Sequence, residues 1–217
     1  MEHLTQYNEI GQHYISAQEE FFQNNDWSRA LVLERVGEIF NKVIVDAGCG
    51  HGVETRLILE GSPKNVIAFD PSTYMIEEAK KRTDSEVVEF VVGDFSHIPA
   101  DDVSVDTLIS CFSLHYMDDI DTAYKEVARV LKQGGKSVFV VPHPEDSAAR
   151  KTTPNDRSVM VELYGDKVTA SYPIHTIDEY FSNYANEHFE ISQQEEVILR
   201  EVSSDRPSVL AFSFTKK

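Results

Sequence analysis

Three glycines and three aspartates are the residues of this chain whose types and spacing most clearly suggest chemistry. Gly48, Gly50 and Gly52 alternate directly after an apolar run, Val43 to Val45, and the acid Asp46. Glycine accepts positive φ and brings bare backbone close to a ligand. A helical pattern follows, so the stretch is typical of a buried strand, a tight turn and a helix whose unpaired N–H groups suit an anionic group.

Asp46, Asp70 and Asp94 end, or nearly end, the first three apolar runs. In an open parallel sheet, ligands bind beyond the carboxyl ends of the strands. Asp46 is placed to order the glycine turn or to reach a ligand ammonium through water. Asp70 is placed for a ribose diol, and Asp94, with Phe95, for a purine amine and ring. Each acid alone fits a helix cap or turn better than a ligand site. Their joint placement favours a ligand.

The elements that position these residues alternate along the chain. Helical patterns separate the apolar runs, and the helical pattern at 120–131 stops at Gly134-Gly135. Within each run the apolar residues are continuous, as expected for strands that are covered on both faces. This indicates βαβ units and an α/β, Rossmann-like, doubly wound sheet. After the run at 43–46, the predicted strands are Asn65 to Asp70, Val87 to Val92, Val103 to Cys111 and Lys136 to Val141.

The flanks follow other patterns. Residues 1–40 predict two helices, and 145–156 predict a polar loop. Gly165-Asp166 between two β-like runs indicates a hairpin. Thr176 to Glu179 matches a capping box, which opens a helix to about Ala185. Two final strands are predicted at 189–202 and 209–214. We expect one domain, 1–217, divided into 1–40, a core at 41–142, an insertion at 143–175 and a C-terminal part at 176–217.

Composition narrows the function classes. The chain has 217 residues and a formal net charge of −17, which disfavours nucleic acid and anionic membranes as partners. Cys49 and Cys111 form neither a disulfide framework nor a metal-ligand cluster. Neither a leader pattern nor a run of membrane-spanning length is evident, so a cytoplasmic setting is expected.

The glycine spacing also separates two cofactor classes. A dinucleotide fingerprint needs a glycine at the sixth position of the motif, where this chain has Val53, and its third glycine, Gly52, falls early. Beyond the turn there is no second nucleotide-binding half. A nicotinamide oxidoreductase is therefore the weaker interpretation.

Taken together, these motifs resemble the class I S-adenosylmethionine-dependent methyltransferases, and within them the small-molecule group that includes the ubiquinone/menaquinone-type enzymes. The similarity covers roughly residues 40 to 142. It rests on Val43 to Gly52, Phe69-Asp70-Pro71-Ser72, Val92-Gly93-Asp94-Phe95, Val105-Asp106 through His115, and Ala128 to Gly135.

The resemblance implies a seven-stranded, mostly parallel sheet with an antiparallel last strand, and an N-terminal helical lid that often presents a tyrosine. The glycine loop would hold the methionine part of the cofactor, Asp70 the ribose, and Asp94 and Phe95 the adenine. Tyr7 is a weaker lid candidate than Tyr14. The cofactor-binding residues expected are Tyr14, Asp46, Gly48, Cys49, Gly50, Gly52, Asp70, Pro71, Met75, Asp94, Phe95, Ser110, Cys111 and Phe112.

The expected reaction is methyl transfer to oxygen, nitrogen or carbon of a small molecule, by a monomer or homodimer. His115 is the best-placed candidate for a base, although a role in positioning cofactor or substrate fits it better. His143 and His175 border the insertion, where substrate choice is expected, but packing roles fit them better. No metal site is expected, because the acids at 118–121 suit helix capping.

Two alternatives remain open. One is a methyltransferase acting on a macromolecule. It is disfavoured by the negative charge and because Ser110 to Ser113 replaces the Asn/Asp-Pro-Pro-aromatic motif of amino-directed base methyltransferases. The other is a non-catalytic protein that binds S-adenosylmethionine.

Overall fold

The computed structural model describes residues 5–21, 27–149, 157–164, 167–197 and 207–217. Its centre is a seven-stranded sheet in the order β3-β2-β1-β4-β5-β9-β8. The strands are β1 (Val43–Ala47), β2 (Asn65–Asp70), β3 (Val88–Val92), β4 (Val105–Cys111), β5 (Leu131–Pro142), β8 (Phe189–Val197) and β9 (Val209–Lys216).

The direction of the strands decides where a ligand can bind. β1 pairs in parallel with β2 and β4, β2 with β3, and β4 with β5. β9 runs antiparallel to both β5 and β8. The predicted fold, with its antiparallel last strand, is therefore confirmed. The carboxyl ends of β1 to β5 share one edge of the sheet, and the strand order reverses between β1 and β4.

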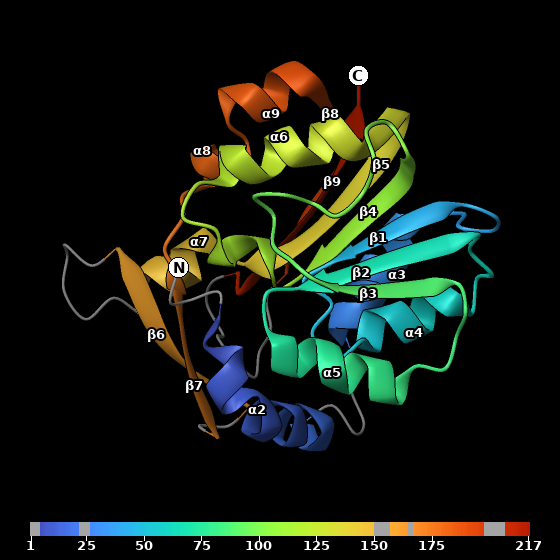
Figure 1. Cartoon of the computed structure of the whole chain (residues 1–217). Helices are drawn as coiled ribbons and strands as arrows, with labels where there is room; N and C mark the ends of the chain where they lie inside the picture. Colours follow the sequence, from blue (N-terminus) through green and yellow to red (C-terminus); the bar gives the residue numbers. More distant parts are fainter. Residues whose placement is uncertain (1–4, 22–26, 150–156, 165–166, 198–206) are drawn as a thin grey trace.

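Helices cover both faces of the sheet (Figure 1). One face carries α6 (Ile120–Val130), α8 (Ile177–Tyr180) and α9 (Asn183–His188). The other carries α3 (Trp27–Val36), α4 (Val53–Leu59) and α5 (Thr73–Arg82). α2 (Tyr7–Phe21) lies farther out, beside α5. Within the described ranges, no helix combines the length and apolar character needed to span a membrane.

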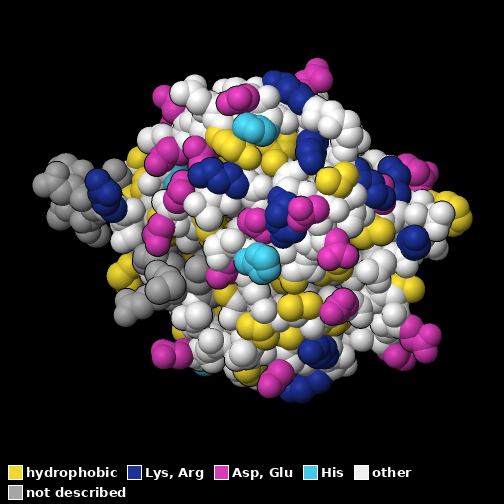
Figure 2. Space-filling model, turned by 45° about the horizontal axis from the view of Figure 1, so that its top comes forward, with side chains coloured by type: hydrophobic (Ala, Val, Ile, Leu, Met, Phe, Trp, Pro, Cys, Tyr) yellow, Lys and Arg dark blue, Asp and Glu magenta, His cyan; other side chains and the backbone are white. Residues whose placement is uncertain are grey.

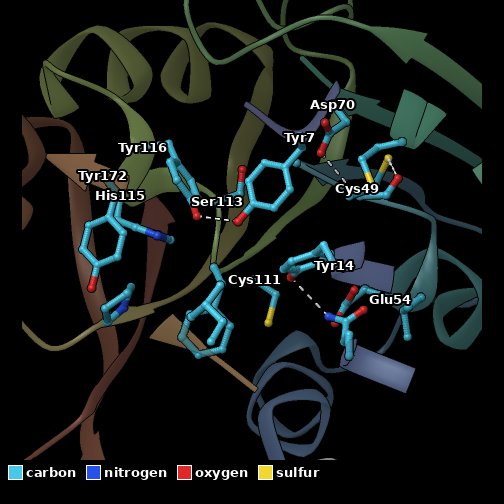
Figure 3. A pocket seen from close by; sticks show the side chains of 18 of the residues that line it. Tyr7, Tyr14, Cys49, Glu54, Asp70, Cys111, Ser113, His115, Tyr116 and Tyr172 are labelled. Carbon is cyan, nitrogen blue, oxygen red and sulfur yellow. Dashed lines mark hydrogen bonds between the residues drawn. The ribbon is translucent and has the colours of Figure 1, made fainter. Parts of the chain in front are cut away.

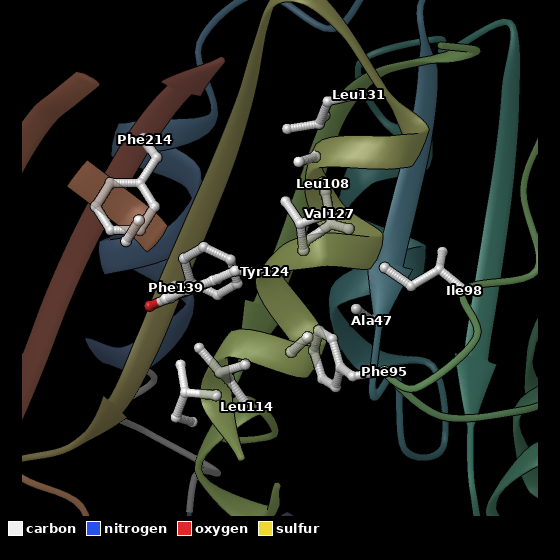
Figure 4. Close-up of a cluster of buried hydrophobic side chains, with 14 of the residues drawn as sticks. Ala47, Phe95, Ile98, Leu108, Leu114, Tyr124, Val127, Leu131, Phe139 and Phe214 are labelled. Atoms are coloured by element: carbon white, nitrogen blue, oxygen red, sulfur yellow. The ribbon is translucent and has the colours of Figure 1, made fainter. Parts of the chain in front are cut away.

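Alternation along the strands builds two apolar layers. Val45 and Ala47 of β1 face the layer under α6, whereas Ile44 faces the layer under α3 and α4. Figure 4 shows the first layer, where Tyr124 of α6 packs on Phe139 and Phe214. The Tyr124 hydroxyl donates to the Tyr180 carbonyl at 2.8 Å, which satisfies its polar group inside the core. Burial on both faces explains the continuous apolar runs of the sequence.

The insertion after β5 forms a separate antiparallel pair, β6 (Ser158–Leu163) and β7 (Val168–Pro173). The predicted hairpin is confirmed for these strands, while its turn, Gly165-Asp166, lies outside the described residues. The prediction of a loop over 145–156 is wrong in its first part. A short helix, α7 (Pro144–Ala149), begins there with two acids in its first turn, where the helix dipole favours negative charge.

Three further boundaries differ from the prediction. The capping box of Thr176 and Glu179 is present, but the helix it opens ends at Tyr180, and Ser182 caps a second one. β4 begins at Val105, because Val103 has a positive φ of 53°. β5 begins at Leu131, so Gly134-Gly135 belongs to the strand and not to a helix cap. The predicted extension of β8 over 198–202 lies outside the described residues.

Candidate functional site

The glycine loop joins β1 to α4 and is tied to the end of β2. The amides of Gly48 and Cys49 donate to the Phe69 carbonyl at 2.8 and 2.9 Å. Gly48 has a φ of +75°, and a Cβ there would lie 1.7 Å from the hydroxyl oxygen of Ser113. Only glycine fits at this point, because the loop after β4 packs directly on it.

Asp70, the last residue of β2, links the glycine loop to α5. Its Oδ2 accepts from the Gly50 amide at 3.0 Å, and its Oδ1 accepts from the Ser72 amide at 2.9 Å. Burial raises the pKa of Asp70 to about 6, while the two amide donors lower it. The carboxyl group is therefore mostly ionised at neutral pH, with lone pairs available for a ligand diol.

A cavity of about 280 Å³ opens beside these residues (Figure 3). It lies at the carboxyl ends of the parallel strands, where the sequence placed the ligand. The predicted residues that line it are Tyr14, Gly48, Cys49, Gly50, Asp70, Pro71, Met75, Asp94, Phe95, Cys111 and Phe112. An added Cβ at Gly50 would meet nothing within 4 Å, so the bare loop borders open space.

Three of the predicted residues are not part of the cavity wall, and each has a structural role instead. Asp46 accepts from the Thr55 hydroxyl at 2.5 Å and is 2% exposed. Gly52 is the left-handed N-cap of α4 and packs against Ala79. The Ser110 hydroxyl accepts from the Leu114 amide at 3.3 Å. These three residues therefore support the loops that form the wall, and their direct contact with a ligand stays a prediction.

The amides of the glycine loop itself are paired with protein groups, whereas the sequence expectation concerned the unpaired N–H groups at the start of the helix that follows. The N–H groups of Gly48, Cys49 and Gly50 all donate to protein acceptors, and Gly52 donates to the Cys49 carbonyl at 2.9 Å. α4 has only seven residues. The glycine loop therefore lets a ligand come close to the bare backbone, and it does not present an array of free amides to an anion.

Asp94 and Phe95 follow β3 at the far side of Asp70. Asp94 Oδ1 accepts from the Ser96 amide at 2.7 Å, so this acid both forms the turn and lines the cavity. The Phe95 ring meets Phe69 edge-on at 5.6 Å between centroids and is nearly buried. A planar ring with a donor group suits this corner.

Two tyrosines of α2 line the cavity and bond across it. The Tyr7 and Tyr116 hydroxyl oxygens are 2.6 Å apart. The Tyr164 hydroxyl donates to the Tyr14 oxygen at 3.0 Å, and the Gln18 amide donates to the same oxygen at 3.3 Å. Burial raises the pKa of Tyr7 and Tyr14 well above the usual value, so both phenols stay neutral.

His115 lines the cavity on the side away from Asp70. Burial, and secondarily the nearby His175, lowers the pKa of His115 well below its usual value, so its imidazole is neutral. His175 and His143 are buried and do not belong to the cavity wall. The His175 Nε2 lies 3.1 Å from the His115 carbonyl oxygen, so it fixes the backbone that carries His115.

The sequence did not single out several wall residues, among them Glu54, Ser113, Gln18 and Asp146. Glu54 follows the glycine loop within the first turn of α4, and Gln18 lies one helical turn after Tyr14. Both spacings are signals that a sequence carries. Asp146 had no such signal, because α7 was not predicted. Within the described ranges, His, Cys, Asp and Glu do not gather in a group that could hold a metal ion.

Comparisons with known proteins agree with this geometry. Residues 45–139 match the family described as a methyltransferase domain. A demethylmenaquinone methyltransferase of Lactococcus lactis subsp. lactis is 33% identical over 129 residues, which cover 57% of this chain and 51% of that protein. A sterol 24-C-methyltransferase of Aspergillus fumigatus is 27% identical over 177 residues, which cover 79% and 44%. The chain thus spans about half the length of these curated relatives.

A solved structure shares the fold. The S-adenosylmethionine-dependent methyltransferase from Mesorhizobium loti superposes with a TM-score of 0.71 and 21% identity, over 86% of this chain and 96% of that chain.

Proposed function

This chain belongs to the class I S-adenosylmethionine-dependent methyltransferases through its core, residues 45–139, and from this premise we propose that it methylates a small molecule. The observation that carries the proposal is the single cavity wall that joins the glycine loop, Asp70 and the Asp94-Phe95 pair. These come from the ends of three adjacent parallel strands. The division into lid, core, insertion and C-terminal part expected from the sequence belongs to the same proposal.

The wall fits the cofactor residue by residue. Gly48 to Gly50 would border the methionine part, and the Asp70 carboxylate would accept from the ribose hydroxyls. Asp94 and Phe95 would hold the adenine, while Cys111 and Phe112 would line the methionine side. Direct contacts by Asp46, Gly52 and Ser110 are not part of the proposal. The side chains of Asp46 and Ser110 bond to protein groups, and protein atoms lie beside Gly52.

The cofactor supplies, when bound, a methyl group on a positively charged sulfur, which makes that carbon strongly electrophilic. The chain's own residues then orient the acceptor and exclude water. Tyr7 and Tyr14 close one side through their hydroxyl pairs with Tyr116 and Tyr164. His115, neutral and at the wall, receives the hydrogen of an acceptor that must lose a proton. Because burial lowers the pKa of His115, the imidazole passes this proton on rather than holding it.

The proposal includes the setting in which the enzyme acts. A net charge of −17 favours a small acceptor over nucleic acid or an anionic membrane. The sparing use of cysteine suits the cytoplasm. The proposal includes a monomer or a homodimer as the form in which the enzyme acts.

Isothermal titration with S-adenosylhomocysteine tests the proposal. The unmodified protein should bind, and Asp70→Ala should weaken binding roughly 10- to 100-fold, as expected when hydrogen bonds to a charged group are lost. Asp101→Ala is the matched control, because Asp101 is exposed and lies outside the wall. Asp70→Asn should retain part of the affinity, which separates loss of the acceptor from collapse of the loop. Absence of binding by the unmodified protein would overturn the function.

A further inference from the structure

The cavity has two chemically different ends. Near the glycine loop its wall is polar, with Asp70 and Asp94. At the opposite end it is formed by η1 (Leu114–Tyr116), the hairpin and α2. That acceptor end presents rings and aliphatic groups: Tyr7, Tyr116, Val161, Leu163, Tyr164 and Tyr172.

The tyrosine hydroxyls of the acceptor end are already paired with protein groups. Tyr7 bonds to Tyr116 and Tyr14 to Tyr164, and the Tyr172 hydroxyl lies 3.3 Å from that of Ser147. Each of these hydroxyl oxygens already has a protein partner, so a ligand there meets mainly the faces and edges of the rings. Ring-shaped ligands pack well on such a wall through offset and edge-to-face contacts.

His115 is the exception to this pairing. Its side chain is 3% exposed and lies between Tyr116 and Tyr172, at 4.2 and 4.6 Å between ring centroids. Among the described residues, its Nδ1 has no hydrogen-bond partner. A buried polar group without a partner costs free energy that a ligand donor can recover. The imidazole therefore marks the place where an acceptor's polar hydrogen is received.

Charge decides which polar groups are admitted. The wall contains five carboxyl groups, those of Glu54, Asp70, Asp94, Asp146 and Glu162, and the described residues that line it include no lysine or arginine. Repulsion between like charges is strong in a partly dry cavity. The bound cofactor adds one net positive charge, which does not balance five carboxyl groups.

We propose that the acceptor is a ring compound without negative charge, which donates an O–H or N–H hydrogen to His115, and that carboxylates and phosphates are excluded. This inference rests on the proposed function and specifies its substrate class. In the transfer, the acceptor's oxygen or nitrogen forms a bond to the methyl carbon as the carbon–sulfur bond breaks. The electron pair of the broken bond stays on sulfur. The proton passes from the acceptor to the His115 imidazole and then to solvent.

A matched set of naphthalene compounds tests the proposal by titration at neutral pH, with S-adenosylhomocysteine saturating. The probes are 2-naphthol, 2-naphthylamine and 2-naphthoate, which share the ring and differ in the head group. One or both of the first two should bind, and 2-naphthoate at least about tenfold more weakly. The tighter of the two uncharged probes tells whether oxygen or nitrogen is preferred.

Variants test separately the hydrogen bond to His115 and the negative charge of the wall. His115→Phe keeps the ring and should weaken binding of the uncharged probe about tenfold, whereas His115→Asn, which keeps an acceptor, should weaken it less. Glu162→Lys should strengthen 2-naphthoate binding. Glu190→Lys changes the net charge equally on exposed β8, outside the wall, and should leave 2-naphthoate binding unchanged.

The outcomes separate this inference from the proposed function. If S-adenosylhomocysteine does not bind, the function itself falls. If it binds but 2-naphthoate binds as tightly as the uncharged probes, or no naphthalene compound binds, the substrate class is wrong. Unchanged affinity of the uncharged probe in His115→Phe would remove His115 from the assignment.

Discussion

The Asp46 carboxyl group behaves differently from the other strand-end acids. Its pKa is raised to about 8, chiefly because it is buried and secondarily because Glu54 is near, while the Thr55 hydroxyl lowers it. The group is therefore protonated at neutral pH in the folded chain. In the unfolded chain it titrates near its usual value of 3.8.

This raised pKa predicts a loss of stability with rising pH. The folded state holds the proton more tightly, so the contribution of Asp46 is complete below about pH 4. It falls as pH rises through about 8 and then levels off, a change of about a few kcal/mol.

Asp46→Asn, which keeps the acceptor for Thr55, should lack this contribution. The free energy of unfolding, measured by denaturant titration across the pH range, should fall more steeply in the unmodified protein. Parallel curves for the two proteins would contradict the assignment of the raised pKa to Asp46.

The three acids show how far a sequence can specify a site. Their positions at strand ends were predictable from the apolar runs. Their roles were not equal. Asp46 follows Ile44 by two residues and so lies on the same face of β1, beneath α4. There the Thr55 hydroxyl donates a hydrogen bond to it. Asp70 ends its strand and turns to the loop. The identity of the hydrogen-bond partner, not the strand pattern, separates structural acids from those of the cavity.

At the scale of elements, α2 connects parts of the chain that are distant in sequence. Asn8 accepts from the Ser72 hydroxyl at 2.8 Å and from the Tyr74 amide at 3.3 Å, at the start of α5. Directly before α2, the Gln6 side chain bonds both backbone groups of Ser171 on β7, at 2.9 and 3.0 Å. α2 therefore spans from the cofactor side to the hairpin. Its amphipathic pattern was visible in the sequence, but these partners were not.

The α2 contacts predict that Tyr14 supports ligand binding through closure. Tyr14→Phe loses the bonds to Tyr164 and Gln18 and should weaken S-adenosylhomocysteine binding about three- to tenfold, with faster amide exchange along α2. Tyr74→Phe is the control, because it removes a 2.7 Å bond to Gln12 on the same helix but outside the cavity wall. Weaker binding in the control alone would argue against closure by Tyr14.

Short-range signals predicted elements well where they acted alone. The capping box of Thr176 and the hairpin strands were both found, since local residues determine them. The break between α8 and α9 was missed because Ser182 caps the second helix with help from Asp121, on α6, to which its hydroxyl donates at 2.6 Å. That partner is reached only when the chain has folded.

At the scale of the whole molecule, the net charge of −17 is the dominant electrostatic property. Figure 2 shows acidic and basic side chains interspersed on one face. Some opposite charges pair locally, as Arg129 and Glu126 do at 2.7 Å. Local pairing does not remove the overall excess of negative charge, which repels itself in the compact state.

This repulsion predicts that salt stabilises the chain. Raising sodium chloride from low to physiological concentration shortens the screening length to about 8 Å. The midpoint of thermal unfolding should therefore rise by several degrees, as followed by circular dichroism. Glu190→Lys, on the exposed strand β8, should raise the midpoint at low salt and reduce its salt dependence. A midpoint that falls with salt would show that attractive pairs outweigh the net charge.

The overall architecture followed from the sequence because alternation of strands and helices leaves few packing solutions. The acceptor end of the cavity did not. It is assembled from α2, η1 and the hairpin, which are well separated in the sequence. Their side chains meet only in the fold, as Tyr7 and Tyr116 do across 109 positions.

Gly48 and Ser113 occupy one shared volume although they follow different strands. A side chain at residue 48 would therefore meet two separate obstacles, the Ser113 hydroxyl and the positive φ of the backbone. Removing the side chain of residue 113 would relieve only the first, because the positive φ strains any side chain at residue 48. Residue 113 thus tolerates change more readily than residue 48, and the two substitutions are not interchangeable.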